Sequence, residues 1–271
     1  MRRQIIQGAH GAIEVLARGG TGETSLFLHG IGATASGWEE LIKRLPGRCA
    51  AWNAPGYGAS SPLNSTAELR QYVDSLVTLL DGLGEERVHV VGHSWGALLA
   101  ASLASDFPQR VRSLALLNPT PGYASLPPEQ RNALLASRLS MLGEVGPAGV
   151  ARRSAPSLVS PHASPELLEV ARELAAGITE QGMRDATRVL FATDLLKILQ
   201  SGWEGPMLVL TGDDDSIGGS DLAPEIERRL RGVRHVAVAR CGHLAPLESP
   251  GLTATELCRL WNSCPTESSR R

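Results

Sequence analysis

The sequence predicts an α/β fold in which a mostly parallel sheet is flanked by helices and interrupted by an inserted helical segment. Short apolar runs alternate with helix-prone stretches over residues 1–120, no convincing strand occurs from Pro121 to Gln200, and the alternation resumes at Met207. This rhythm is typical of parallel sheets that are covered by helices on both faces. We therefore expect a first core segment (1–120), a helical cap (121–202) and a second core segment (203–271).

Seven apolar runs bounded by turn residues have the length and composition of strands. They are residues 4–8, 25–28, 49–52, 88–91, 112–117, 207–211 and 236–238.

Helices are predicted between these strands and throughout the insertion. Apolar residues around Leu41 mark a short first helix, and residues 65–68 (Ser-Thr-Ala-Glu) have the pattern of a capping box that opens a second, which Gly84 ends. In the insertion, residues 129–142, 165–176 and 183–191 have helical spacing, with Ser164 as an N-cap.

The insertion leaves the predicted sheet just after Asn118, at the carboxyl edge, where α/β proteins bind their ligands. We interpret it as a cap over an active site. The alternative is a helical bundle on the far side of the molecule that plays no part in binding.

Residues 92–96, Gly-His-Ser-Trp-Gly, form the most informative motif of the chain. They join a predicted strand to a predicted helix, and the Gly-x-Ser-x-Gly pattern in that position is typical of a nucleophile elbow, with Ser94 as the nucleophile. The motif also occurs by chance in ordinary turns, so the assignment depends on a base and an acid elsewhere in the chain.

The loop at residues 29–32, His-Gly-Ile-Gly, follows an early strand and is expected to supply half of an oxyanion hole. The two donors would be the backbone N–H groups of Ile31 and Trp95, because acyl transfer needs N–H groups aimed at the developing negative charge. The alternative, a phosphate-binding loop, is disfavoured because neither Gly-Lys-Ser/Thr nor Gly-x-Gly-x-x-Gly is present.

An acid and a base follow the nucleophile in the order Ser, Asp, His. Residues 212–215, Gly-Asp-Asp-Asp, end a late strand and leave three aspartates open as the acid. His243 follows the last predicted strand and is the expected base, since imidazole titrates near neutral pH. Of the other histidines, His93 is expected to pack within the elbow and His29 to brace the oxyanion loop.

The substrate pocket is expected to include His29, Gly30, Trp38 and Tyr57, although aromatic residues beside a sheet edge often serve packing alone. One or two of the cap arginines could turn inward and bind a substrate carboxylate, while the others are solvated. These arginines are Arg131, Arg138, Arg152, Arg153, Arg172, Arg184 and Arg188.

Composition excludes several classes of function. The net charge of −2 and the lack of a basic stripe argue against nucleic-acid and anionic-membrane partners. The four cysteines lack metal-ligand spacing, and neither a signal peptide nor a transmembrane span is apparent, so a reduced, cytoplasmic setting is expected. We expect a small-molecule substrate, no metal and no cofactor, and the sequence is compatible with a homodimer.

These motifs together resemble the α/β-hydrolase superfamily over nearly the whole chain. The resemblance rests on residues 29–32, 53–60, 92–96, 212–215 and 242–250. Its acid loop has the form Gly-x-x-Asp, which selects Asp215. The chain departs from the family at Asn53, where an aspartate is frequent, and at Trp95, where many relatives have Leu or Met. We expect Asn53 to alter a structural hydrogen bond and not the chemistry, and the indole of Trp95 to narrow one wall of the pocket.

Within the superfamily, the cap is similar to those of 3-oxoadipate enol-lactonases and meta-cleavage-product hydrolases. The resemblance implies a serine hydrolase that cleaves a small ester or lactone through a Ser-His-Asp triad and an acyl-enzyme. The alternatives are a C–C bond hydrolase of a dienoate, a small-molecule receptor on the same fold, and a cofactor-independent oxygenase or acyltransferase.

Overall fold

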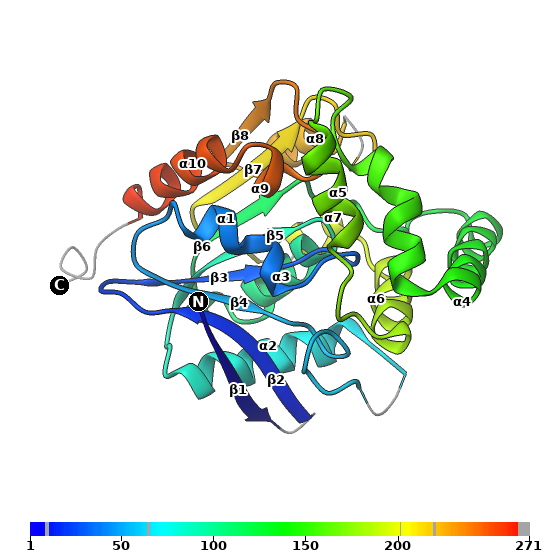
Figure 1. Cartoon of the computed structure of the whole chain (residues 1–271). Coiled ribbons are helices and arrows are strands. Elements are labelled where there is room, and N and C mark those ends of the chain that lie inside the picture. The colour runs from blue at the N-terminus through cyan, green and yellow to red at the C-terminus, as the bar shows by residue number, and fades with distance from the viewer. Residues whose placement is uncertain (9–10, 64–65, 201, 219–220, 265–271) are drawn as a thin grey trace.

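An eight-stranded sheet forms the centre of the computed structural model, which describes residues 1–8, 11–63, 66–200, 202–218 and 221–264 (Figure 1). The spatial order of the strands is β1-β2-β4-β3-β5-β6-β7-β8. The strands are β1 (Arg2–Gly8), β2 (Gly11–Arg18), β3 (Thr24–Leu28), β4 (Arg48–Trp52), β5 (Val88–His93), β6 (Val111–Leu117), β7 (Met207–Gly212) and β8 (Val233–Val238).

The mostly parallel sheet of the prediction is confirmed. Strands β3 to β8 are parallel to one another, whereas β1 pairs antiparallel with β2 and β2 antiparallel with β4. The prediction missed β2, which contains the buried Glu14. A buried carboxylate needs partners, and those of Glu14 come from distant segments: Asn53 donates to it through Nδ2 (2.8 Å), as does the backbone N–H of Ala59 (2.6 Å).

Helices cover both faces of the sheet. Contacts place α2 and α3 on one face, and α1, α9 and α10 on the other. Alternate residues of one strand enter the two cores, as Leu26 and Phe27 of β3 do. The core helices are α1 (Glu39–Ile42), α2 (Leu69–Leu83), α3 (Trp95–Asp106), α8 (Leu222–Arg229), α9 (Ala245–Glu248) and α10 (Pro250–Asn262), with short 3₁₀ turns η1 (Ala35–Trp38) and η2 (Pro108–Arg110).

The predicted start of the second helix was wrong. Helix α2 begins at Leu69, with Glu68 as its N-cap, and the side chain of Gln71 accepts the backbone N–H of Glu68 at 2.9 Å. The same kind of reciprocal pattern therefore lies three residues later than predicted, while Ser65 lies outside the described residues. The helix ends as expected at Gly84, which has a left-handed conformation (φ 70°).

Four helices occupy the stretch between β6 and β7: α4 (Pro128–Leu158), α5 (Pro165–Glu173), α6 (Glu180–Ala192) and α7 (Leu195–Gln200). Helix α4 contacts both α5 and α6, and these three helices stand beyond one end of the sheet (Figure 1), whereas α7 packs on the core helix α3. A non-helical residue, Gly146, divides α4 into two parts. Ser164 caps α5 as predicted, since its side chain accepts the N–H of Leu167.

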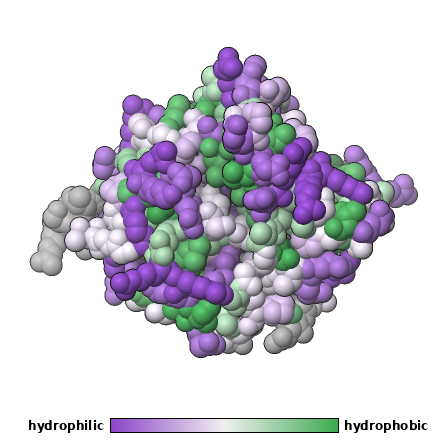
Figure 2. Space-filling model, in the orientation of Figure 1, coloured by the Kyte–Doolittle hydropathy of each residue, from purple (hydrophilic) through white to green (hydrophobic). Residues whose placement is uncertain are grey.

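None of the described helices combines the length and the apolar character needed to cross a membrane. On the face drawn in Figure 2, hydrophilic residues surround smaller hydrophobic areas.

Candidate active site

A sharp turn between β5 and α3 carries Ser94. Its backbone has φ 54° and ψ −117°, a conformation that is rare for a residue with a side chain and costs about 1–3 kcal/mol. A Cβ on Gly92 would collide with the carbonyl oxygen of Gly96, and one on Gly96 would collide with that of Leu28. The two glycines therefore let the turn close against its own helix and against β3, and the strained turn presents the Ser94 hydroxyl to the cavity described below.

Ser94, His243 and Asp215 are joined by hydrogen bonds although they come from three distant segments. Nε2 of His243 lies 2.8 Å from Oγ of Ser94, and Nδ1 of His243 lies 2.9 Å from Oδ2 and 3.0 Å from Oδ1 of Asp215. The side chains of His243 and Asp215 are only 3% and 5% exposed. With Nδ1–H donating to the carboxylate, Nε2 is free to accept the serine proton, so this chain of groups can move a proton from Ser94.

The carboxylate of Asp215 is held by further donors. It accepts Nδ2 of Asn118 at 2.9 Å and the backbone N–H groups of Ile217 and Gly218 at 2.8 and 3.1 Å. Burial alone would raise the pKa of Asp215, but the hydrogen bond and charge of His243, together with the bonds from Asn118 and Ile217, hold it well below its usual range. Asp215 is therefore ionised throughout the neutral range.

The two neighbouring aspartates have other surroundings. Asp214 accepts the hydroxyl of Ser160 at 2.6 Å, and Asp213 is exposed. Of the three consecutive aspartates, Asp215 is the one that contacts His243.

The loop that carries His243 is fixed on both sides of that residue. Oε1 of Glu248 accepts the backbone N–H groups of Gly242 (3.0 Å) and Leu244 (3.2 Å), and the N–H of His243 donates to the carbonyl of Leu158 at the end of α4 (2.7 Å). The insertion is thus bonded directly to the loop that holds the imidazole.

His29 and His93 are buried neutral imidazoles with structural contacts. His29 donates through Nδ1 to the carbonyl of Gly30 (2.8 Å) and accepts the N–H of Ala54 (3.1 Å), whereas His93 donates through Nε2 to the carbonyl of His243 (2.7 Å). Burial lowers the pKa of His29 to about 4 despite the Gly30 carbonyl, and burial with the nearby His243 lowers that of His93 to about 3.

These two shifts predict a loss of stability in mild acid. The folded pKa values lie below the unfolded value of 6.5, so the unfolded chain binds more protons than the folded protein below that pH. The stability that these neutral histidines contribute is therefore complete above pH 6.5 and declines as the pH falls toward 4. For each histidine, the free energy of unfolding should fall by about 2 kcal/mol as the pH is lowered from 7 to 5. Urea unfolding at these two pH values should show a smaller pH effect in His29→Gln and His93→Gln.

The exposed His162 offers the control for this measurement. His162→Gln should keep the wild-type pH dependence. Equal pH dependence in all four proteins would contradict the assignment of two buried neutral imidazoles.

The two expected oxyanion donors lie on segments that meet beside Ser94. A Cβ on Gly30 would lie 3.2 Å from Cβ of Ser94, which shows how closely the loop of Ile31 approaches the elbow. Among the described residues, no hydrogen bond engages the backbone N–H of Ile31 or of Trp95. Both groups are therefore available to an incoming oxygen, Trp95 as the first residue of α3.

A cavity of about 370 Å³ lies above the Ser94–His243 pair. Its lining includes Gly30, Ile31, Ser94, Trp95 and His243, together with residues of α4, α5 and α6. The insertion therefore supplies part of the cavity wall, as the cap interpretation requires.

Three of the expected pocket residues do not line this cavity. His29 and Trp38 border a smaller adjoining cavity of about 30 Å³, and Tyr57 borders neither. Tyr57 is fully buried and donates its hydroxyl to the carbonyl of Ile31 at 3.0 Å. Tyr57 and His29 therefore bond to the backbone of the loop at residues 29–32, and Trp38 packs against Phe27 with ring centroids 5.2 Å apart.

The sequence interpretation missed several lining residues, which come from loops as well as from α4 and α6. Helical spacing does not reveal which residues of the insertion turn inward. Only tertiary packing selects them. The missed residues include Thr120, Tyr123, Met141, Leu142, Met183, Thr187, Leu190 and Leu244.

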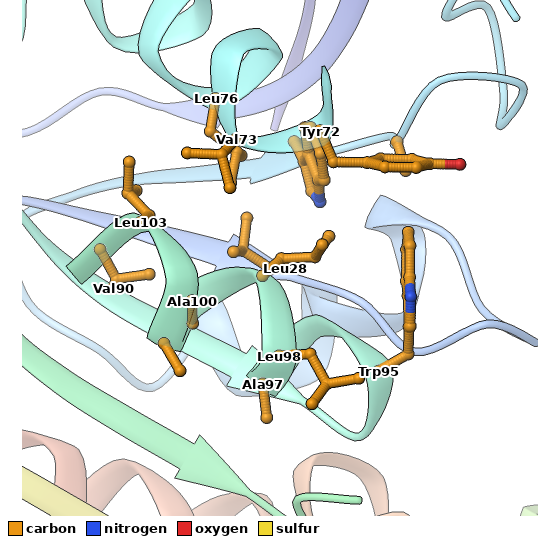
Figure 3. Close-up of a cluster of buried hydrophobic side chains, with 14 of the residues drawn as sticks. Leu28, Tyr72, Val73, Leu76, Val90, Trp95, Ala97, Leu98, Ala100 and Leu103 are labelled. Carbon is orange, nitrogen blue, oxygen red and sulfur yellow. The ribbon is translucent and has the colours of Figure 1, made fainter. Parts of the chain in front are cut away.

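The indole of Trp95 is fully buried and packs in the core beside Tyr72 of α2 (Figure 3). Its ring meets Tyr72 edge-on with centroids 5.1 Å apart and lies nearly parallel to Tyr57 at 6.4 Å. The indole therefore lies between α2 and the loop after β4, whereas Trp95 also contributes to the cavity lining. That the indole narrows the pocket stays a prediction.

The other departure, Asn53, has a structural role, as expected. Its Oδ1 accepts the N–H of Ala35 at 2.8 Å, and its Nδ2 donates to the buried Glu14. An amide suits this position because it donates to a carboxylate and accepts from a backbone group at the same time.

A family model described as "alpha/beta hydrolase fold" matches residues 26–250. The chain belongs to the α/β hydrolase fold family. A solved enol-lactonase from Burkholderia xenovorans superposes on this α/β hydrolase with a TM-score of 0.86 at 18% identity, over 96% of this chain and 100% of the other.

Two curated relatives match part of this α/β hydrolase. One is the dihydrolipoyllysine-residue acetyltransferase component of an acetoin cleaving system from Cupriavidus necator, 41% identical over 104 residues. The other is a 2-hydroxy-6-oxononadienedioate/2-hydroxy-6-oxononatrienedioate hydrolase from Pseudomonas putida, 38% identical over 112 residues. The alignments cover 38% of this chain in both cases, and only 28% and 38% of the two relatives.

Within the ranges that the structure describes, no group of three or more His, Cys, Asp or Glu side chains could hold a metal ion.

Proposed function

We propose that this α/β hydrolase cleaves a small ester or lactone, with Ser94 as the nucleophile, His243 as the base and Asp215 as the acid. The observation that carries the proposal is the hydrogen-bonded chain from Ser94 Oγ through His243 to Asp215 at the floor of a largely apolar cavity. Paired nucleophile, base and orienting acid are the arrangement that activates a serine hydroxyl.

Each step follows from a group at the site. His243 takes the proton of Ser94 as Oγ attacks the acyl carbon, and the N–H groups of Ile31 and Trp95 hold the oxyanion. His243 then gives the proton to the leaving alkoxide, and the C–O bond breaks. A water molecule, deprotonated by His243, attacks the acyl-enzyme and releases the carboxylic acid and Ser94.

The second candidate is hydrolysis of a C–C bond in a dienoate. The Pseudomonas putida relative is named for such a substrate, and the same nucleophile and base would serve. A third candidate is acyl transfer to an acceptor other than water, which the name of the Cupriavidus relative suggests. Each of the two alignments covers little more than a third of this chain.

The test is a substrate panel of p-nitrophenyl acetate and butyrate, small lactones and a meta-cleavage dienoate, with Ser94→Ala as the control. Ser94-dependent release from esters or lactones at about 1 s⁻¹ or faster would support the proposal. Turnover of the dienoate alone would reassign the protein to C–C bond hydrolysis. Failure of every substrate would reject ester and lactone cleavage in favour of a receptor or a non-hydrolytic role.

A further inference from the structure

Arg138 differs from every other residue of the cavity wall. The lining contributed by the insertion is mainly apolar, and of the described residues that line the cavity only Arg138 carries a permanent charge. It is an exposed residue of α4 that nevertheless belongs to the lining, so it lies at the rim, where cavity and solvent meet.

Two aromatic rings hold the Arg138 guanidinium. Its central carbon lies 5.0 Å from the ring centroid of Tyr123 and 5.3 Å from that of Phe191, and Nη2 donates to the Tyr123 hydroxyl at 2.7 Å. The two rings stack with centroids 4.4 Å apart. Tyr123 follows β6 and Phe191 belongs to α6, so three separate segments fix this side chain.

No acidic partner neutralises it. Three other arginines of the insertion pair with acids on their own helices: Arg172 with Glu169, Arg184 with Glu180 and Arg188 with Asp185. Arg138 forms no ion pair with any of the residues that the structure describes, and its hydrogen bond to the Tyr123 hydroxyl uses one of five N–H donors. A guanidinium that two rings fix at the rim of an apolar cavity, and that no acid neutralises, is suited to binding a carboxylate, since it can present two parallel N–H donors.

We propose that Arg138 binds a carboxylate of the substrate, so that this hydrolase prefers esters or lactones that carry a free carboxylate in addition to the bond that is cleaved. The inference rests on the proposed function and narrows its substrate class. The competing explanation is structural: Arg138 would only join α4 to α6 through the two rings.

The test compares esters that differ only in charge. p-Nitrophenyl hexanoate is the neutral reference, mono-p-nitrophenyl adipate places a carboxylate on the acyl side, and 4-carboxyphenyl hexanoate places it on the leaving group. The methyl ester of the adipate probe controls for size. Rates of Ser94→Ala are subtracted throughout, and thermal unfolding of each variant is recorded.

For Arg138→Gln we expect kcat/KM to fall roughly 10- to 100-fold on at least one acid ester, mainly through KM, and less than about 3-fold on both neutral esters. Arg138→Lys should recover part of the loss, because it keeps the charge without the planar fork. Arg153→Gln, an exposed arginine of α4 outside the lining, is the matched control and should behave as wild type.

Two outcomes overturn the inference while the proposed function stands. One is equal kcat/KM on acid and neutral esters in wild type and Arg138→Gln. The other is an equal loss on all esters accompanied by a lower melting temperature, which would indicate the structural role. Absence of Ser94-dependent turnover on every ester is a different result, and it would reject the proposed function and this inference with it.

Discussion

Replacing Ser94 with alanine is expected to lower ester turnover by about 10⁴-fold or more and to leave the fold intact. The hydroxyl is the proposed nucleophile, and among the described residues its one hydrogen bond is to Nε2 of His243, so its loss removes the reacting atom without opening the core. Alanine also tolerates the strained turn as well as serine does, because both have a Cβ at the same backbone angles. The measurements are kcat on p-nitrophenyl butyrate and the urea midpoint of unfolding.

Ser157→Ala is the control for this variant, because Ser157 also lines the cavity but donates its hydroxyl to its own helix, at the carbonyl of Ser154. Its activity should remain within a few-fold of wild type. If Ser94→Ala retained more than a tenth of the activity, the assignment of the nucleophile would be wrong.

Asp215→Asn should have the next largest effect, a fall in kcat of about 10⁴-fold. An asparagine can offer an N–H where Asp215 offers an acceptor, which would favour the tautomer of His243 that cannot take the proton of Ser94. The amide also cannot stabilise the imidazolium that forms during attack. Steady-state kinetics above pH 7 measure the effect.

The run of three aspartates supplies matched controls. Asp213 is exposed and Asp214 accepts Ser160, so Asp213→Asn should be neutral and Asp214→Asn should cost less than about 10-fold. A larger loss in Asp214→Asn than in Asp215→Asn would contradict the geometry of the site.

The core was predictable from sequence because its signals are local. The apolar run before Gly92, the small residues of the elbow and the helix after Trp95 all lie within about twenty residues, and β5 and α3 form as expected. The strand β2 was missed because Glu14 and Arg18 resemble solvent-facing residues. Arg18 donates to the carbonyls of Leu45 and Gly47, far along the chain.

The residues of the site were predictable only where the local sequence of a loop determines their role. Residues alone left Asp213, Asp214 and Asp215 open, and only the spacing of the family motif singled out Asp215, which is the one that meets His243. Which of the seven arginines of the insertion lines the cavity depends on how α4 and α6 pack around Phe191, and no local sequence pattern encodes that packing. Tyr57 was expected in the pocket, but tertiary packing buries it behind the loop, where its hydroxyl donates to Ile31.

The central claim, covalent catalysis by Ser94, is tested most directly by mass spectrometry of the enzyme quenched in acid during turnover of p-nitrophenyl acetate. The account predicts one added acetyl group, located on the peptide that contains Ser94, absent from Ser94→Ala, and more abundant when His243→Ala slows deacylation relative to acylation by an activated ester. Steady hydrolysis with no acetyl group at Ser94, or an adduct of equal abundance in Ser94→Ala, would contradict it.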